Sequence, residues 1–531
     1  VIWLEMAEAL APLSAPPGGL TVANWNIAAI NNNPFEYWIS HDDAHYAELM
    51  ADFERFIETP GDLDVQVGAV FSQEQFEQLR ELMKTEGWPA LDAVNEAWEN
   101  KFSKSKIVSE FMTDKTLGLK RLISMPDRIT NTFRAVNREG PVCRPTVINQ
   151  YVDSLVNVEE WWPKWQKFMF EEEFEIEQKG KVKTLRPCQM LGKISRTKYP
   201  ALTEEEEEMS IPLQTLCMAI FDAVLVHIMS SLSPDGRWQD IKKSMVESMI
   251  TKKDELVLDI LRQTCAGVDI ICLQEVALSF KAMLQSALGS EYEVLSPCHE
   301  SKNNQNSFIM VRNATFPKGS FTELTSSVHE VLGGTAPLEA GDIIAVSIAD
   351  ATGRKFLLAS FHGDTNGLAT KPVVKAVCEV LEKEAPGHLL VFGMDANVDL
   401  TPKKGVQDVE DFLEHCKAHS LTSCWPEDTG MADCCTVCNA RTYVQPQINK
   451  AIKSSELLTK GNINPNDHIL VQKDAFEVMG IFKDNTGERR YVEKVPFPTL
   501  RFPSDHALVS VVLKSKGTPM EVDAEAPATE G

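Results

Sequence analysis

The stretch GVDIICLQEV (267–276) decides the fold class. A glycine turn precedes a β-branched, apolar run that ends in Gln274 and Glu275, as in a buried strand that carries polar side chains to a sheet edge. Similar runs follow it in chain order, with helical stretches such as 371–385 and 409–419 between them. They are NSFIMVRN, IIAVSIAD, KFLLASFHGDTNG, HLLVFGMDANVD, NDHILVQK and HALVSVVLK. Strands alternating with helices predict an α/β fold.

Polar side chains stand where these runs end. One further run, LTVANWN (20–26), ends in Asn26. Strand ends are where sheet enzymes gather catalytic groups, so we treat the set as a candidate site. Its members are Asn26, Glu275, His362 with Asp364, Asp395 with Asn397, Asp467, and Asp505 with His506.

The chemistry of this set favours phosphate-ester hydrolysis. Carboxylate and amide oxygens suit Mg²⁺, and two histidines exchange protons near neutral pH. The sequence has neither a nucleophile-elbow serine nor a GxxxxGKS/T phosphate loop. Hydrolysis by metal-activated water therefore fits better than covalent catalysis.

Each element also has a structural interpretation on its own. Asn26 can simply end a strand, Gln274 and Glu275 can form an edge pair, and Asp395 with Asn397 can form an Asx turn. Ser504 and Asp505 are good helix-capping residues. The functional interpretation depends on the order of the elements, each after a strand-like run.

That order resembles the endonuclease/exonuclease/phosphatase superfamily, the fold of pancreatic deoxyribonuclease. The resemblance covers residues 20–30 and about 265–514 and implies a four-layer α/β sandwich, two packed mixed β-sheets flanked by helices. Two motifs depart from the family: the T-H-L motif matches only partly, and Met394 separates Gly393 from D-x-N. The motifs here are NWNI (24–27), LQEV (273–276), SFHG (360–363), GMDAN (393–397), DHI (467–469) and SDH (504–506).

The resemblance implies a metal centre. Glu275 would bind the catalytic Mg²⁺ (Mn²⁺ is the alternative), with Asn26 as second ligand and Asp505 close to the metal. Asp395 would orient or deprotonate the attacking water, or hold a second metal. Asn397 would position that water or the phosphate.

The resemblance also gives both histidines roles. His506 would contact the scissile phosphate and stabilise charge growing on its oxygens. Asp467 would hold the His506 ring in the useful tautomer. His362 would bind a phosphate oxygen or assist the leaving group.

A long helical segment interrupts the core. Asn26 and Glu275 are 249 residues apart, and residues 41–262 repeat apolar residues at helical spacing. We therefore expect an inserted all-helical domain that acts as a lid, a substrate wall or a docking platform, or else as a scaffold without a catalytic part. The predicted parts are the first strand and loop (20–40), the insertion (41–262), the rest of the core (263–515) and a disordered acidic tail (516–531).

Three further residues are substrate-binding candidates. Asp364 and Asn366 of HGDTNG contact substrate or metal, or else form a turn. Arg441 binds a phosphate or makes a surface salt bridge. The most apolar window (211–232) contains Asp222, which favours a core helix over a membrane span.

Composition limits the partners and the compartment. The formal charge of −25 argues against a non-specific DNA coat protein and against a nuclease with a basic DNA-binding face. The 12 scattered cysteines favour reduced thiols, with a zinc site at Cys424, Cys434, Cys435 and Cys438 as the alternative. No signal peptide is visible, and the first residue is Val1, so we expect a cytoplasmic or nuclear protein whose N-terminus is incomplete.

The sequence thus predicts a Mg²⁺-dependent phosphoesterase, foremost a nuclease or nucleotide phosphodiesterase acting on single-stranded RNA or a nucleotide. One alternative is a phosphomonoesterase acting on an inositol phosphate, a lipid headgroup or a small metabolite. The W-x-D-R pattern of the inositol-phosphatase branch is missing before Asp467. Another alternative is a catalytically silent scaffold whose insertion binds a protein partner.

Overall fold

The computed structural model describes residues 13–28, 31–178, 180–299, 305–427 and 429–516. They form two compact units. The core unit falls within residues 1–29, 254–438 and 462–531, and the helical unit within 30–253 and 439–461. The boundaries expected from the sequence, with an insertion at 41–262, stay a prediction. The acidic tail expected at 516–531 lies outside the described residues, except for Lys516.

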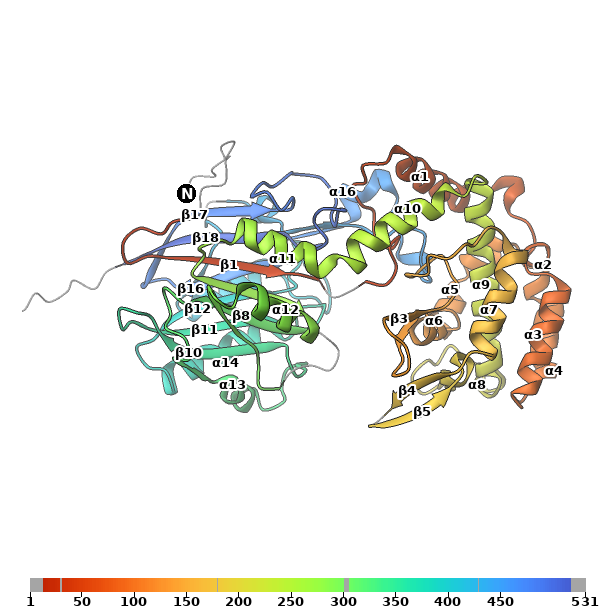
Figure 1. Cartoon of the computed structure of the whole chain (residues 1–531), viewed down its shortest axis with the longest axis horizontal. Helices are drawn as coiled ribbons and strands as arrows, with labels where there is room; N and C mark the ends of the chain where they lie inside the picture. The colour runs from red at the N-terminus through yellow and green to blue at the C-terminus, as the bar shows by residue number, and fades with distance from the viewer. Residues whose placement is uncertain (1–12, 29–30, 179, 300–304, 428, 517–531) are drawn as a thin grey trace, which may run out of the picture. The chain divides into compact units, whose positions relative to one another are not determined.

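The core unit contains two six-stranded sheets (Figure 1). The first has the order β17 (Phe476–Asp484), β18 (Leu508–Ser515), β1 (Leu20–Asn26), β6 (Ile270–Val276), β8 (Asn306–Arg312) and β7 (Tyr292–Leu295). The second has the order β13 (Leu421–Ser423), β16 (Asp467–Gln472), β12 (Leu389–Asp395), β11 (Lys355–His362), β10 (Ile343–Ala349) and β9 (Phe321–Glu323). Both are mixed, because β1–β6 and β11–β12 are parallel pairs among antiparallel neighbours.

The alternation of side chains along the strands builds four layers. In β6, Ile270 and Cys272 face the second sheet, in one cluster with Val391 of β12. Ile271 and Leu273 point the other way, towards α11 (Lys253–Thr264) and α12 (Leu278–Leu288). The predicted four-layer sandwich is therefore confirmed.

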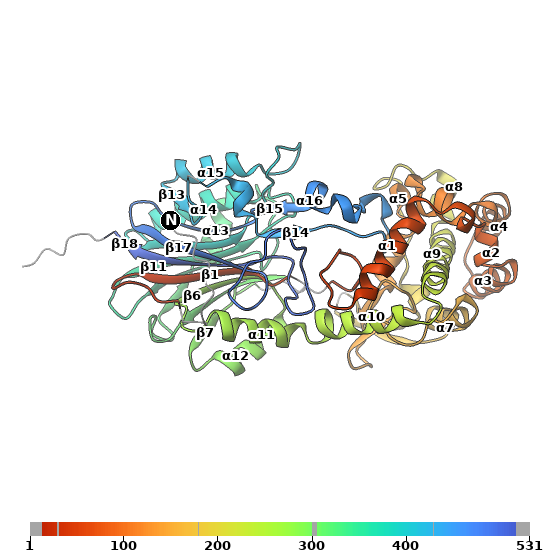
Figure 2. The ribbon, with the colours of Figure 1, turned by 90° about the horizontal axis from the view of Figure 1, so that it is seen from above.

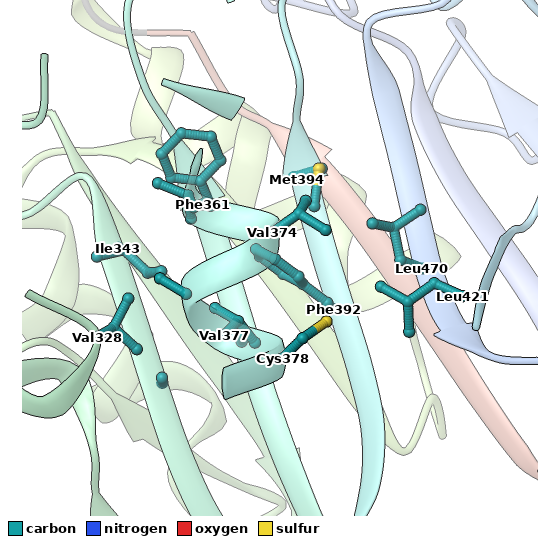
Figure 3. Close-up of a cluster of buried hydrophobic side chains, with 14 of the residues drawn as sticks. Val328, Ile343, Phe361, Val374, Val377, Cys378, Phe392, Met394, Leu421 and Leu470 are labelled. Carbon is teal, nitrogen blue, oxygen red and sulfur yellow. The ribbon is translucent and has the colours of Figure 1, made fainter. Parts of the chain in front are cut away.

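Helices also cover the outer face of the second sheet. Figure 3 shows Val374, Val377 and Cys378 of α14 (Thr370–Lys383) packed against Phe392 and other strand residues. The neighbouring helices are α13 (Thr325–Leu332) and α15 (Val409–Ala418). Figure 2 shows α14 and α15 on one side of the strands and α11 and α12 on the other.

A polar bridge joins the two sheets. The Gln274 amide of β6 donates to Asn24 Oδ1 at 2.8 Å and to Ser360 Oγ of β11 at 3.0 Å. The Asn24 amide donates to the Met394 carbonyl of β12 at 3.1 Å. The close approach requires glycine at 393, where a Cβ would lie 2.5 Å from the Cβ of Cys272. The bridge fixes the strand ends that carry the site.

The helical unit is built around a buried apolar helix, α9 (Ser210–Leu232). Its other helices are α1 (Ala44–Glu58), α2 (Val67–Val70), α3 (Gln73–Thr85), α4 (Leu91–Asn100), α5 (Lys115–Lys120), α6 (Ser124–Thr130), α7 (Val158–Phe170), α8 (Glu204–Glu208), α10 (Arg237–Val246) and α16 (Leu457–Lys460). Among the described residues, α9 is long and apolar enough to cross a membrane, and 78% of its most apolar window is buried inside the structure.

The expectation of an all-helical insertion needs a correction. Two antiparallel ribbons interrupt the helices: β2 (Thr132–Arg134) with β3 (Pro141–Cys143), and β4 (Phe174–Gln178) with β5 (Lys181–Leu185). In β4 the buried side chains alternate with exposed ones, which suits a strand rather than a helix. The remaining short strands are β14 (Val437–Asn439) and β15 (Asn462–Asn464).

A buried ion pair lies at the centre of the helical unit. The Arg144 guanidinium donates to Asp222 Oδ2 of α9 at 2.8 Å and to Asp127 Oδ1 at 2.7 Å. Asp222 also accepts bonds from Thr146 at 2.7 Å and from the Trp165 indole at 3.0 Å. These bonds compensate the cost of burying Asp222 in an apolar helix.

Candidate active site

Four strand ends place the predicted site residues together in the core unit. Asn26 and Glu275 lie at the ends of the parallel strands β1 and β6, and His362 and Asp395 at the ends of β11 and β12. The first residue of antiparallel β16, Asp467, is the register partner of Asp395. Because parallel strands end at the same edge, both sheets bring their polar ends to one place.

The backbone is strained at two of these ends. Glu275 has a φ of 54° and Asn397 a φ of 48°, values that residues other than glycine rarely adopt. Between Leu273 and Val276 the ladder with β8 slips by one residue, so Glu275 sits on a β-bulge. Strain of this kind clusters at functional sites.

Asp395 contacts four other residues of the site. Its Oδ2 accepts a bond from Asn26 Nδ2 at 2.8 Å and lies 3.5 Å from His362 Nε2 and 3.6 Å from His506 Nε2. Its Oδ1 accepts the backbone N–H of Asn397 at 3.0 Å. Asp395 is 1% exposed, so its charge acts in a poorly screened environment.

Glu275 contacts two of the residues that Asp395 contacts, Asn26 and His362. Its Oε1 accepts a bond from Asn26 Nδ2 at 3.2 Å and lies 3.7 Å from His362 Nε2. The Asn26 amide therefore links the two carboxylates as a donor, because its Oδ1 already accepts the Ala28 N–H at 2.8 Å. A ligand role for the Asn26 oxygen stays a prediction.

His506 is held from both ends. Its Nδ1 lies 2.9 Å from Asp467 Oδ2, and its backbone carbonyl accepts a bond from the Trp25 indole at 2.9 Å. Burial lowers the pKa of His506, but the carboxylates of Asp467 and Asp395 outweigh burial and raise it well above its usual range. These carboxylates favour the protonated ring, whose Nε2 lies 3.6 Å from Asp395 Oδ2.

The donor set fits a divalent cation. Carboxylate oxygens of Asp395 and Asp467 come within 4.8 Å of each other, and Asp467 Oδ1 is buried without a hydrogen-bond partner. His506 lies beside them as a donor to the carboxylates, and a protonated imidazole is not a metal ligand. Asp505 adds a further negative charge beside His506. The site contains four carboxylates, those of Glu275, Asp395, Asp467 and Asp505. If His362 and His506 were both protonated, the net charge of these six groups would be −2. A hard dication such as Mg²⁺ matches this excess and these oxygens.

The three substrate-binding candidates make local contacts in the structure. Asp364 forms a turn: its carboxylate accepts the N–H of Asn366 at 3.1 Å and of Ala369 at 2.9 Å. Asn366 is exposed in the same turn. Arg441 belongs to the helical unit, where it pairs with Glu36 at 2.9 Å. These contacts match the turn and salt-bridge alternatives, and substrate contact stays a prediction for all three.

Sequence reasoning missed two residues beside the site. Thr436 Oγ1 donates to Asp467 Oδ2 at 2.6 Å, and the side chain of Asn466 donates to Asn397 Oδ1 at 3.4 Å. Thr436 lies within the cysteine cluster that suggested zinc. Within the described part of the chain, the groups with metal-ligand geometry include none of these cysteines, and burial raises the pKa of Cys434 to about 12. The cysteines on either side of Thr436 drew attention away from it, although its hydroxyl donates to Asp467, the partner of His506.

We expect Thr436→Val to lower kcat for the reaction at this site roughly tenfold, because it removes a bond to a buried carboxylate while keeping the shape of the side chain. Thr436→Ser keeps the hydroxyl and should restore most of the rate. Steady-state kinetics of both variants test this. A valine variant with the wild-type kcat would show that Asp467 needs no such support.

Residues 64–243 match a family model described as Domain of unknown function (DUF8234). A search of the curated proteins found no match. Among solved structures, the human Nocturnin catalytic domain with bound sulfate has 15% identity and a TM-score of 0.32, covering 51% of this chain and 89% of that one.

Two further structures are similar over the same share of the chain. D. rerio TDP2 complexed with single strand DNA product has 11% identity and a TM-score of 0.33, covering 50% of this chain and 92% of that one. An endonuclease/exonuclease/phosphatase family protein from Bacteroides thetaiotaomicron has 17% identity and a TM-score of 0.30, with coverages of 49% and 88%. The core unit itself contains the two packed, mixed six-stranded sheets that its motifs predicted.

Proposed function

We propose that the protein is a Mg²⁺-dependent phosphoesterase that hydrolyses phosphodiester bonds, as a nuclease or nucleotide phosphodiesterase. One observation carries the proposal: the buried Asp395 carboxylate lies within 3.6 Å of the Nε2 atoms of two histidines, and the Glu275 carboxylate lies 3.7 Å from the same Nε2 of His362. A buried carboxylate beside imidazoles supplies a proton acceptor together with N–H donors.

Each residue of the site has its own role in the proposed hydrolysis. Mg²⁺ held by Glu275, with Asp395 nearby, would neutralise charge on the phosphate and lower the pKa of water. Asp395 accepts the proton of the attacking water. His506, kept cationic by Asp467, donates from Nε2 to a phosphate oxygen as negative charge grows on it. His362 donates to a second oxygen or to the leaving group.

The net charge of the chain bears on the substrate class. The overall field of a chain of formal charge −25 repels duplex DNA more strongly than a single strand, which carries less charge per unit length, or a nucleotide. Single-stranded RNA or a nucleotide is therefore preferred over duplex DNA. A phosphomonoesterase acting on an inositol phosphate, lipid headgroup or small metabolite uses the same residues and is the second candidate. A silent scaffold has no need for a buried, paired His506.

The proposal extends to location and partners. All 12 cysteines lie among the described residues and are free thiols, which supports a reducing compartment, cytoplasmic or nuclear. The helical unit is proposed to bind a protein partner or to limit access of substrate.

A substrate panel with and without Mg²⁺ tests the function. It contains single-stranded RNA, single-stranded and duplex DNA, a dinucleotide, an inositol polyphosphate and a generic phosphomonoester. We expect Mg²⁺-dependent cleavage of a diester that is lost in His506→Ala. His388→Ala, which changes a histidine bonded to Ser347 away from the site, is the control and should keep the activity. Absence of cleavage throughout the panel would favour the scaffold.

A further inference from the structure

Two asparagine side chains meet beside Asp395. Asn397 follows the end of β12, and its N–H donates to Asp395 Oδ1 at 3.0 Å. Asn466 precedes β16, and its carbonyl accepts the Ala396 N–H at 2.7 Å. The Asn466 amide donates to Asn397 Oδ1 at 3.4 Å. Two hydrogen bonds donated by backbone N–H groups thus hold this pair of amides next to Asp395.

The pair leaves one donor and one acceptor unused. Asn397 Nδ2 and Asn466 Oδ1 are buried and have no hydrogen-bond partner. Turning both amides over exchanges the two roles but still leaves one amide nitrogen and one amide oxygen unpaired. Because buried polar groups are rarely left unpaired, such a pair indicates a ligand group that accepts one hydrogen bond and donates another.

We propose that Asn466, together with Asn397, binds a free hydroxyl on the carbon next to the one that carries the scissile phosphoester. A hydroxyl both accepts and donates, so it satisfies the two unused atoms at once. The position follows from the contacts: Asn397 is bonded to Asp395, where the phosphate is expected. The inference rests on the proposed function and narrows its substrate class.

Access to the pair comes from Asn397. Asn466 is 5% exposed, whereas Asn397 is half-buried. Both unused atoms are closed to solvent, so bulk water does not satisfy them. The Asn397 side chain, which is partly exposed as a whole, has to turn to admit the hydroxyl to the buried Asn466.

The chemistry is shared by two sources. Ribonucleotides in RNA carry a 2′-hydroxyl beside a 3′-phosphodiester, and inositol 1-phosphate carries a hydroxyl on each carbon next to the phosphorylated one. A site that hydrogen-bonds a substrate hydroxyl rejects the analogue lacking it, because its own polar groups then remain unpaired. The protein should therefore discriminate within matched substrate pairs.

The experiment compares kcat/KM within two sets of substrates in the full-length protein with Mg²⁺. One set is a ribodinucleotide with its 2′-deoxy and 2′-O-methyl forms, and the other is inositol 1-phosphate with cyclohexyl phosphate. We expect the wild type to prefer the free hydroxyl by about 10- to 100-fold in one set, which identifies the source. Asn466→Ala should bring that ratio close to one, mainly by slowing the hydroxyl substrate.

Asn464→Ala is the matched control. Its amide lies two residues away, donates to Asn462 at 2.7 Å and accepts from the Leu400 N–H at 3.0 Å, so the ratio should not change. Thermal unfolding checks that each variant folds, and Asn466→Ser replaces the alanine variant if that one does not.

Two results would overturn the inference alone. In one, the wild type cleaves the members of each set at equal rates. In the other, Asn466→Ala slows both members equally, which would make Asn466 a support for Asn397. If the wild type cleaves no substrate, the proposed function itself fails and takes this inference with it.

Discussion

Replacing Asp395 by asparagine is expected to lower kcat/KM for phosphoester hydrolysis by about 10³-fold or more. The substitution keeps the shape of the side chain and its bond to the Asn397 N–H. It removes the charge that faces Asn26, His362 and His506, and so removes the proton acceptor. Initial rates at saturating and limiting substrate measure the loss.

Asp399→Asn provides the control for this substitution. Asp399 lies four residues further along, accepts the Thr401 N–H at 2.9 Å and pairs with Lys403 in the same loop. It should keep nearly full activity. An Asp395→Asn variant with more than about a tenth of the wild-type rate would contradict the central role of Asp395.

Replacing Arg144 by methionine is expected to lower the free energy of unfolding of the helical unit by about 3–5 kcal/mol. The change leaves Asp222 buried in α9 without its cation, and burial already raises the pKa of that carboxyl. Combining it with Asp222→Leu removes the stranded charge and should recover a large part of the loss. Urea unfolding followed by far-UV circular dichroism measures the three variants.

Arg196→Met is the comparison for Arg144. Its ion pair with Glu204 is exposed and 3.6 Å long, so its loss should cost less than about 1 kcal/mol. Equal losses for Arg144→Met and Arg196→Met would show that the buried pair has no special weight. A double variant no more stable than Arg144→Met would show that the network matters through its hydrogen bonds.

The strand ends were predictable because each is a local pattern. An apolar run that stops at a polar residue marks Asn26, Glu275 and Asp395 without knowledge of the sheet order. Their convergence followed from the resemblance of the whole series, since strand pairing over some 250 residues leaves no local signal. The α/β fold class could be predicted because the series of strand-like runs and helical stretches is itself visible in the sequence.

Other parts of the site depend on contacts that no spacing encodes. Thr436 and Asn466 directly precede the strands β14 and β16, but their position in the sequence does not show which side chains they contact. Those contacts form only after the sheets pack. The ribbon β4–β5 had a usable signal, the alternation around Phe174 and Ile176 followed by a glycine turn, which the acidic helical texture concealed. The segment 439–461 consists of loops and short helical segments, including α16, and nothing in its sequence places it in the helical unit.

The central place of β1 in its sheet has a consequence for biosynthesis. Thr21 pairs with Asp269, 248 residues later, and Leu20 with Leu513. At about 5–20 residues per second, roughly 12–50 s pass on the ribosome before β6 is made. β18 emerges later still. Throughout that time the apolar strand LTVANWN lacks both neighbours, so the nascent chain depends on chaperones or early folding of the helical unit to keep it from aggregating.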